Sequence, residues 1–243
     1  MKILVFFSSL FKGLILLLKP HYLFGFIIKP LQFIINTLLL SRWKSNLIKD
    51  SQALDDFYSY KRDYNKRYLL YEHLLKTHKL DEDEITYMEF GVASGSSFNW
   101  WLKNLPLQST RLFGFDTFEG LPENWGAFDK GSMAYDLPDI SDNRAEFIKG
   151  LFQNTLEKFI EDKRELLKKR LIIHLDADLF SATLYSLFML KPFLKKGDIL
   201  MFDEFNVPNH EFYAFRLFCE SGYLKVKLIA AVNNYYQAAF IIQ

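Results

Sequence analysis

The segment Ile85–Ser97, ITYMEFGVASGSS, has the residue types and order of a turn that binds a nucleotide-like cofactor. An apolar predicted strand contains Glu89, and Gly91, Gly95 and Ser97 follow it at the start of a predicted helix. Glycines let the backbone of such a turn come close to a ligand. A carboxylate here would repel a pyrophosphate and attract a cationic group, so the pattern E-x-G-x-x-x-G favours S-adenosylmethionine over NAD. A glycine-rich turn without a ligand is the alternative.

The next predicted strand, Arg111–Asp116, ends in an acidic residue. Asp116 follows the glycine turn at the distance at which an acid can accept hydrogen bonds from ribose hydroxyls. Glu119 is a rival acid, but it lies further into the loop. We expect Asp116 and Phe118 to border the same cofactor.

Three more carboxylates, those of Asp176, Asp203 and Glu204, follow the predicted strands Leu171–Leu175 and Ile199–Phe202. The carboxyl ends of parallel strands meet at one edge of a sheet, so we expect these side chains to converge. Carboxylates that close together repel one another unless a cation or protons intervene. Oxygen ligands of this kind suit Mg²⁺, and the alternative is that Asp203 or Glu204 caps the following helix.

Two candidates can accept a proton at this edge. Asp176 can bind metal and also act as the base, and His210, which follows the last of these strands, is the alternative base. His174 shares the face of Asp176 because side chains alternate along a strand. It lies two residues earlier and therefore deeper, so we expect a structural role for it.

Apolar runs alternate with helical patterns from residue 85 onward, which is typical of a parallel sheet with crossover helices. The remaining predicted strand is Ala145–Lys149, and helices are expected near 96–105, 152–169, 181–195 and 209–221. Two final runs, Tyr223–Val232 and Tyr235–Ile242, are joined by Asn233-Asn234, which indicates a hairpin. The prediction is an α/β, Rossmann-like sheet, mostly parallel, with seven strands and a terminal antiparallel hairpin.

Two further segments carry many aromatic residues. Residues 51–80 are predicted to form one or two amphipathic helices with a shared face of Phe57, Tyr64, Tyr68, Tyr71 and Leu75. The segment Glu119–Asp139, with Trp125, Phe128 and Tyr135, is predicted to be a mobile lid over an acceptor, or else an ordinary surface loop.

Length and charge limit the classes of function. The 243 residues suffice for one α/β domain with an appendage. Residues 1–50 carry seven Lys or Arg and one acid, whereas the remainder carries 23 basic and 28 acidic residues. A weakly acidic body is not typical of a nucleic-acid-binding protein. The single cysteine, Cys219, excludes an intramolecular disulfide and fits a reducing compartment.

Residues 1–48 are far more apolar than the rest, but Lys2, Lys12, Lys19 and Lys29 interrupt them. A spanning helix needs about 20 predominantly apolar residues, and no uninterrupted run is that long. We predict two or three short helices, broken near Pro20 and Pro30, that lie in a membrane interface with their lysines at the headgroups. The alternatives are a span over residues 20–41 and a helical arm that forms a homo-oligomer or covers the core.

The segments EFGVASGSS, FGFDTFEGLP, KGLFQNTL and HLDADLFSATLYSLFMLKPFLKKGDILMFDEF resemble, in order and spacing, the macrocin O-methyltransferase family. The resemblance covers about residues 55–243. It implies a class I S-adenosylmethionine-dependent methyltransferase that acts on a sugar hydroxyl with Mg²⁺. By this resemblance Asp176, Asp203 and Glu204 match metal-binding carboxylates, and Glu89, Gly91 and Asp116 match the cofactor site. The family usually has two aspartates at the final pair, so Glu204 departs from its pattern.

The expected protein is therefore an O-methyltransferase domain over residues 49–243, with a membrane-interface segment over 1–48. Its cofactors would be S-adenosylmethionine and Mg²⁺, and its acceptor a small molecule or a lipid-linked saccharide. It would lie at the cytoplasmic face of a membrane or otherwise in the cytoplasm. A catechol-type O-methyltransferase and an inactive membrane-tethered scaffold remain alternatives.

Overall fold

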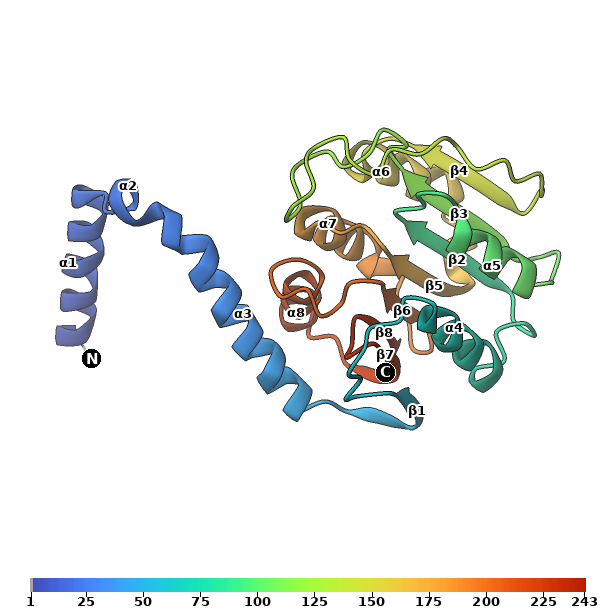
Figure 1. The fold of residues 1–243 in the computed structure, drawn as a ribbon, viewed down its shortest axis with the longest axis horizontal. Coiled ribbons are helices and arrows are strands. Elements are labelled where there is room, and N and C mark those ends of the chain that lie inside the picture. Colours follow the sequence, from blue (N-terminus) through green and yellow to red (C-terminus); the bar gives the residue numbers. More distant parts are fainter. Residues whose placement is uncertain (1) are drawn as a thin grey trace.

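A mixed sheet of eight strands forms the centre of the structure, a computed structural model that describes residues 2–243 (Figure 1). Its spatial order is β1-β7-β8-β6-β5-β2-β3-β4. The pairs of β8 with β6 and β7 are antiparallel, and the other pairs are parallel. The strands are β1 (Lys49–Asp55), β2 (Ile85–Phe90), β3 (Arg111–Asp116), β4 (Ala145–Lys149), β5 (Arg170–Leu175), β6 (Ile199–Phe202), β7 (Val226–Val232) and β8 (Gln237–Ile242).

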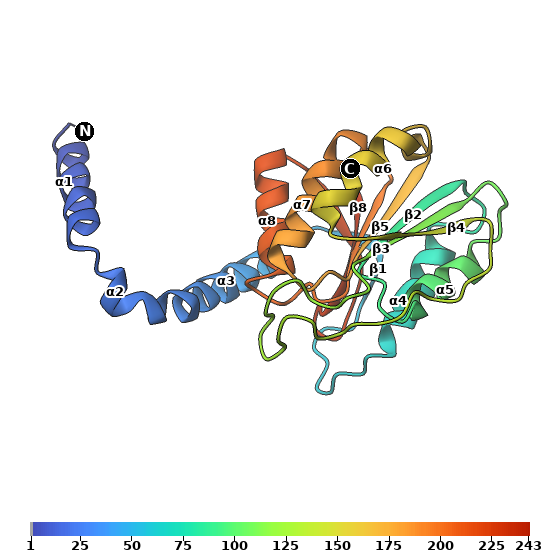
Figure 2. The same cartoon turned by 90° about the horizontal axis from the view of Figure 1, so that it is seen from above.

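Helices cover both faces of this sheet (Figure 2). The central strands β2 and β6 are therefore buried on both sides. Helices α4 (Lys66–Thr77) and α5 (Ser96–Asn104) contribute to the apolar cluster on one face. Helices α6 (Phe152–Lys163), α7 (Phe180–Leu190) and α8 (Glu211–Gly222) contribute to the cluster on the other face.

The order in which the chain adds strands to the sheet changes direction between β2 and β5. From β2 it passes through α5 to β3 on one side, whereas β5 pairs with the other side of β2. Ligands of open α/β sheets bind at the carboxyl ends of strands at such a switch point. The glycine turn after β2 and the acids after β5 therefore lie at the expected location.

The predicted parallel strands and the terminal hairpin are confirmed, but the count of seven strands was wrong. The extra strand is β1, which pairs with β7 and forms one edge of the sheet. It lies where a helix was predicted, and residues 56–65 are a loop that leads to α4. Phe57 and Tyr64 therefore lie outside the helix on which we expected them. The hairpin loop is also longer than predicted, because β7 ends at Val232 and β8 begins at Gln237.

The N-terminal segment is helical and extends away from the sheet (Figures 1 and 2). It consists of α1 (Lys2–Leu18), the short helix α2 (His21–Phe24), a 3₁₀ turn (Gly25–Ile27) and α3 (Ile28–Ser45). The predicted break near Pro20 is confirmed, and a second break, the 3₁₀ turn Gly25–Ile27, ends three residues before Pro30. Pro30 lies in the first turn of α3, where proline is tolerated because the backbone N–H groups there have no partner within the helix.

The C-terminal part of α3 packs on the body. Leu39, Leu40 and Trp43 lie against the cluster beneath α6, α7 and α8. The ring of Trp43 is 5.0 Å from that of Phe205, and rings of Phe212, Phe215, Tyr235 and Phe240 lie within 6.2 Å. The first part of the N-terminal segment is thus free and its last part is anchored.

Candidate active site

A cavity of about 610 Å³ lies at the carboxyl ends of the central strands. Among the predicted site residues, Gly91, Ser97, Asp116, Asp176 and Glu204 line it. Its volume is within the usual range for small-molecule sites. The structure thus brings the predicted cofactor turn and two of the predicted metal ligands to one cavity.

The glycines of the turn are required by the protein's own backbone. Gly91 has φ +95°, and a Cβ there would lie 1.8 Å from the carbonyl oxygen of Asp176. Gly95 has φ +76° at the start of α5, and its Cβ would lie 2.9 Å from the side chain of Pro138. Gly91 therefore lets the turn pack directly on the chain that carries Asp176.

The Asp116 carboxylate holds this turn. Its Oδ2 accepts hydrogen bonds from the N–H groups of Val92 and Ala93 at 2.8 and 2.9 Å, and its Oδ1 accepts one from Phe118 at 2.8 Å. Carboxylate oxygens can accept more than one hydrogen bond, so Asp116 can also receive a ligand hydroxyl from the cavity. Phe118 itself packs beneath the turn with the cluster around α5 and is not among the residues that line the cavity.

Glu89 is fully buried and does not line the cavity. Ser97 donates a hydrogen bond to its Oε1 at 2.5 Å, and the Tyr87 hydroxyl donates to its Oε2. The Tyr87 hydroxyl also lies 2.8 Å from Nδ1 of His174. Ser97 thus stands between the cavity and Glu89, whose direct contact with a cofactor stays a prediction.

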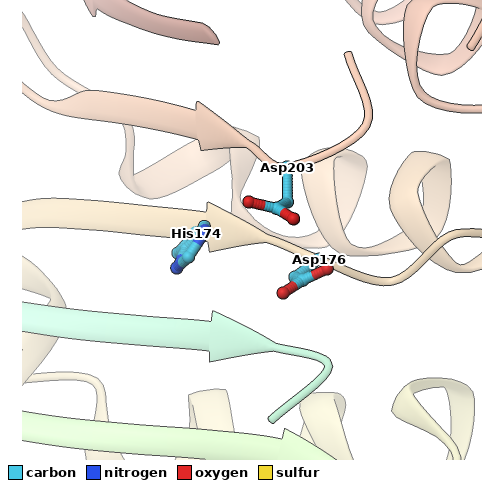
Figure 3. Close-up of side chains that lie close together, drawn as sticks. All are labelled: His174, Asp176 and Asp203. Atoms are coloured by element: carbon cyan, nitrogen blue, oxygen red, sulfur yellow. The ribbon is translucent and has the colours of Figure 1, made fainter. Parts of the chain in front are cut away.

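His174 lies within β5, and Asp176 directly follows the last residue of that strand (Figure 3). His174 is buried among aromatic rings, with Nε2 3.5 Å from the Tyr71 hydroxyl. Asp176 lies just beyond the end of the strand and lines the cavity. This arrangement agrees with the expected structural role of His174.

The structure gathers more carboxylates than the three predicted. Asp178 follows Asp176, and Glu211, in the first turn of α8, accepts a hydrogen bond from the Glu204 N–H at 3.0 Å. Oxygen atoms of Asp176, Asp178 and Glu204 lie within 4.8 Å of one another. A second group with the same spacing joins Asp176 and Asp203 to a nitrogen of His174. Asp176 is common to both.

Burial makes negative charge costly in this cluster. Burial, followed by the charges of neighbouring acids, raises the pKa of Asp176 and Glu204 well above the usual range. Burial is also the main cause that raises the pKa of Glu211 well above that range and of Asp178 to about 6. Within residues 2–243, Oδ1 of Asp203 and Oε2 of Glu204 have no hydrogen-bond partner. A divalent cation with oxygen ligands fits this donor set and would satisfy such oxygens.

Two tyrosines that the sequence interpretation missed hold the acids after β6. The Tyr64 hydroxyl donates to Oδ2 of Asp203 at 2.6 Å, and Arg67 donates to the Tyr64 hydroxyl at 2.6 Å. The Tyr236 hydroxyl donates to Oε1 of Glu204 at 3.0 Å. Tyr64, Arg67 and Tyr236 come from far apart in the sequence, and no motif spacing indicates them.

His210 and the segment Glu119–Asp139 lie around the cavity. Trp125, Phe128 and Tyr135 of that segment line it, as expected for a lid, although its mobility stays a prediction. His210 does not line the cavity, and its ring lies edge-on to Trp125 at 6.4 Å. Burial is the main cause that lowers the pKa of His210, which favours the neutral form. A role for His210 as a base would need the lid to move.

Without divalent cations, we expect the free energy of unfolding to fall as the pH rises from about 6.5 to 8. The folded-state pKa values of Asp176, Glu204 and Glu211 are raised, so the folded protein retains protons in this range that the unfolded chain has lost. Stability is therefore greatest at the lower pH. Burial also lowers the pKa of His210 and His78, so these two histidines oppose this trend, but only until the unfolded chain has lost their protons, about one pH unit above 6.5.

Urea unfolding in EDTA at several pH values measures this slope, and Glu211→Gln should reduce it because one titrating group is removed. Added Mg²⁺ should stabilise the protein most at the higher pH, where the carboxylates are ionised. Stability that increases with pH over this range in EDTA would contradict the prediction.

Residues 88–205 match a family described as a methyltransferase domain. This stretch contains the glycine turn and the acids after β3, β5 and β6. A crystal structure of CalS11, described as a calicheamicin methyltransferase, is similar with a TM-score of 0.59 and 19% identity, covering 86% of this chain and 91% of that chain. The chain has a methyltransferase fold.

Two more structures agree. An apo structure of CalS11, described as a TDP-rhamnose 3'-O-methyltransferase, is similar with a TM-score of 0.55 and 19% identity, covering 86% of this chain and 93% of that one. The O-methyltransferase NovP is similar with a TM-score of 0.53 and 15% identity, covering 70% and 79%. At sequence identities this low, the structural similarity shows a shared fold alone. No curated protein matches the chain.

Proposed function

We propose that the protein is an S-adenosylmethionine-dependent, Mg²⁺-dependent O-methyltransferase that methylates a hydroxyl of a sugar or glycolipid-type acceptor. The observation that carries this proposal is a single cavity that holds both the glycine turn with Asp116 and the carboxylates after β5 and β6. The glycine turn with Asp116 suits a nucleoside cofactor. The carboxylates suit a cation that hydroxyl groups of an acceptor can coordinate. The match of residues 88–205 to a methyltransferase domain supports the same function.

The cofactor would lie against the turn after β2. Asp116 is placed to accept hydrogen bonds from ribose hydroxyls, as acids at the end of the second strand do in related folds. Ser97, bonded to Glu89, presents its side chain at the cavity wall. The carboxyl group of Glu89 is buried behind Ser97, and acidic oxygens there would favour the cationic end of the cofactor over an anionic one.

Asp176 would hold the cation, either together with Asp178 and Glu204 or together with Asp203 beside His174. A bound Mg²⁺ supplies Lewis acidity, which lowers the pKa of a coordinated hydroxyl. Tyr64 and Tyr236 fix the orientation of Asp203 and Glu204. Asp176 lies at the centre of the cluster and can accept the proton that the acceptor hydroxyl loses. Methyl transfer from a sulfonium needs no acid for the leaving group, so the protein must mainly position the two reactants.

The aromatic residues that line the cavity support the proposed class of acceptor. Trp125, Phe128 and Tyr135 give the cavity aromatic faces, against which sugar rings can pack. The similar structure described as a TDP-rhamnose 3'-O-methyltransferase supports a sugar acceptor. Closure of this segment over the cavity would exclude water, which protects the sulfonium from side reactions.

Calorimetry of the full-length protein with S-adenosylmethionine, with and without Mg²⁺, tests the cofactor assignment. We expect binding that Asp116→Asn weakens about tenfold or more, because ribose hydroxyls lose a charged acceptor. The matched control is Asp136→Asn, which alters an exposed carboxylate of the lid segment. Absence of binding would contradict the proposal and favour a scaffold. Methyl incorporation from labelled cofactor into fractionated glycans and lipids tests the acceptor, and labelling confined to small catechol-like molecules would contradict the sugar class.

A further inference from the structure

The N-terminal helices expose an unusually continuous apolar surface. Every large apolar side chain from Leu4 to Leu38 is exposed, including Phe11, Leu17 and Phe26 at 65%, 76% and 78%. These residues occupy α1, α2 and most of α3, which extend away from the body (Figures 1 and 2). Apolar patches of this extent mark contact with a membrane or a protein.

The charges of this segment favour an anionic lipid surface. Residues 1–49 contain seven Lys or Arg and no acidic residue. Lys12 and Lys19 are exposed beside the apolar side chains. Long basic side chains can place their ammonium groups at lipid headgroups while their methylene stems stay among the acyl chains. A second copy of this chain would offer the same positive charges and no acids along these helices.

The length of the free helix argues against a crossing of the bilayer. The stretch His21–Ser45 is long and apolar enough to span when taken alone. However, Asn36 donates a hydrogen bond to Oδ1 of Asn209 at 2.9 Å, and Trp43 packs in the core, so residues from 36 onward are bound to the body. Residues 21–35 would reach only about 22 Å at 1.5 Å per residue, against a hydrocarbon core of about 30 Å. Helix α1, of 17 residues, would reach about 26 Å and contains Lys12.

The anchored part of α3 also lies next to the rim of the cavity. Asn209, which bonds Asn36, precedes His210, and the His210 ring lies edge-on to Trp125 of the cavity wall. After burial, the main cause, the charge of Lys29 also lowers the pKa of His210, so the start of α3 is within electrostatic reach of this rim. A surface that holds α3 therefore also lies close to the cavity.

We infer that residues 4–35 lie in one leaflet of an anionic membrane without crossing it, and that α3 holds the rim of the cavity at that leaflet. This placement does not depend on methyl transfer. It implies that an acceptor can reach the cavity from the lipid surface. The ligand of the N-terminal segment is thus a lipid leaflet, rather than a second protein.

Flotation of the full-length protein with vesicles of phosphatidylcholine and phosphatidylglycerol tests the lipid contact. We expect the protein to float with these vesicles and Lys12→Glu/Lys19→Glu to reduce the bound fraction about tenfold or more, because each basic residue contributes about 1 kcal/mol. The matched control, Lys103→Glu/Lys196→Glu, reverses two exposed charges on the body and should float normally. A protein that stays unbound and dimerises in solution would overturn the inference in favour of an oligomer arm.

Labelling of an introduced cysteine distinguishes a segment that lies in one leaflet from a helix that spans the bilayer. Tyr22 lies between α1 and α3 and would reach the far side if α3 crossed the bilayer. For Tyr22→Cys added to sealed vesicles, we expect no reaction with an impermeant maleimide trapped inside. The control Tyr223→Cys, at a position 93% exposed on the body, should react only with maleimide added outside. Reaction of Tyr22→Cys with the trapped reagent would overturn the inference. Cofactor binding, measured separately, reports on the proposed function.

Discussion

Replacement of Asp176 by asparagine is expected to lower the rate of methyl transfer by roughly a thousandfold, while the protein stays folded and keeps its affinity for S-adenosylmethionine. Asp176 belongs to both groups of side chains that could hold a cation, and it lines the cavity. An amide cannot accept the acceptor's proton and is a weaker ligand for Mg²⁺. The substitution thus removes the two roles proposed for one carboxylate.

The same substitution should not destabilise the metal-free protein. Burial and the neighbouring acids raise the pKa of Asp176, so its negative charge costs free energy in the folded state. A neutral side chain of the same size relieves that repulsion, and we expect an equal or higher melting temperature in EDTA. The stabilisation by Mg²⁺ should shrink. The control Asp136→Asn should leave both activity and melting temperature unchanged, and near-normal rates in Asp176→Asn would refute the assignment.

Gly91→Ala is expected to cost roughly 3–5 kcal/mol of stability, the largest effect we predict for a single methyl group. A Cβ at this position would lie 1.8 Å from the carbonyl oxygen and 2.6 Å from the carbonyl carbon of Asp176. Both atoms belong to the backbone after β5, which cannot turn away as a side chain can. The backbone must shift, and the shift would move Asp176 from the cavity.

Gly197→Ala is a close control for this prediction. Gly197 has φ +96°, against +95° for Gly91, but a Cβ there would meet nothing within 4 Å. It therefore measures the cost of the backbone conformation alone, which we expect to be about 1–2 kcal/mol. Urea unfolding of both variants separates the strain from the collision. Equal losses in the two variants would show that the contact with Asp176 adds nothing.

The central strands could be predicted because their sequences specify them locally. Strands such as Ile85–Phe90 and Ile199–Phe202 are short apolar runs that are buried on both faces, and their bounds agree with the structure. The strand Lys49–Asp55 has no such pattern, and it is a strand because it pairs with β7 at the edge of the sheet. Its conformation is set by tertiary pairing, which outweighs the local preference of its residues.

The residues of the candidate site also divide into those that the local sequence predicts and those that only tertiary structure brings together. The glycine turn, Asp116 and the acids after β5 and β6 could be found because each follows an apolar strand in the sequence. Tyr64, Tyr236 and Glu211 could not, because they meet the acids only when the loop before α4, the hairpin and α8 come together. Aromatic spacing assigned Tyr64 to a helical core face, whereas its hydroxyl bonds Asp203.

The insertion of Trp43 has a consequence for where this protein can be shortened. Its ring lies among those of Phe205, Phe212, Phe215, Tyr235 and Phe240, so it completes the interior of the body although it belongs to the N-terminal helices. A chain that begins at residue 49 would leave this aromatic pocket open to water and prone to self-association. A chain that begins near residue 36 would keep it filled and lose only the exposed apolar helices, so the useful cut lies within α3.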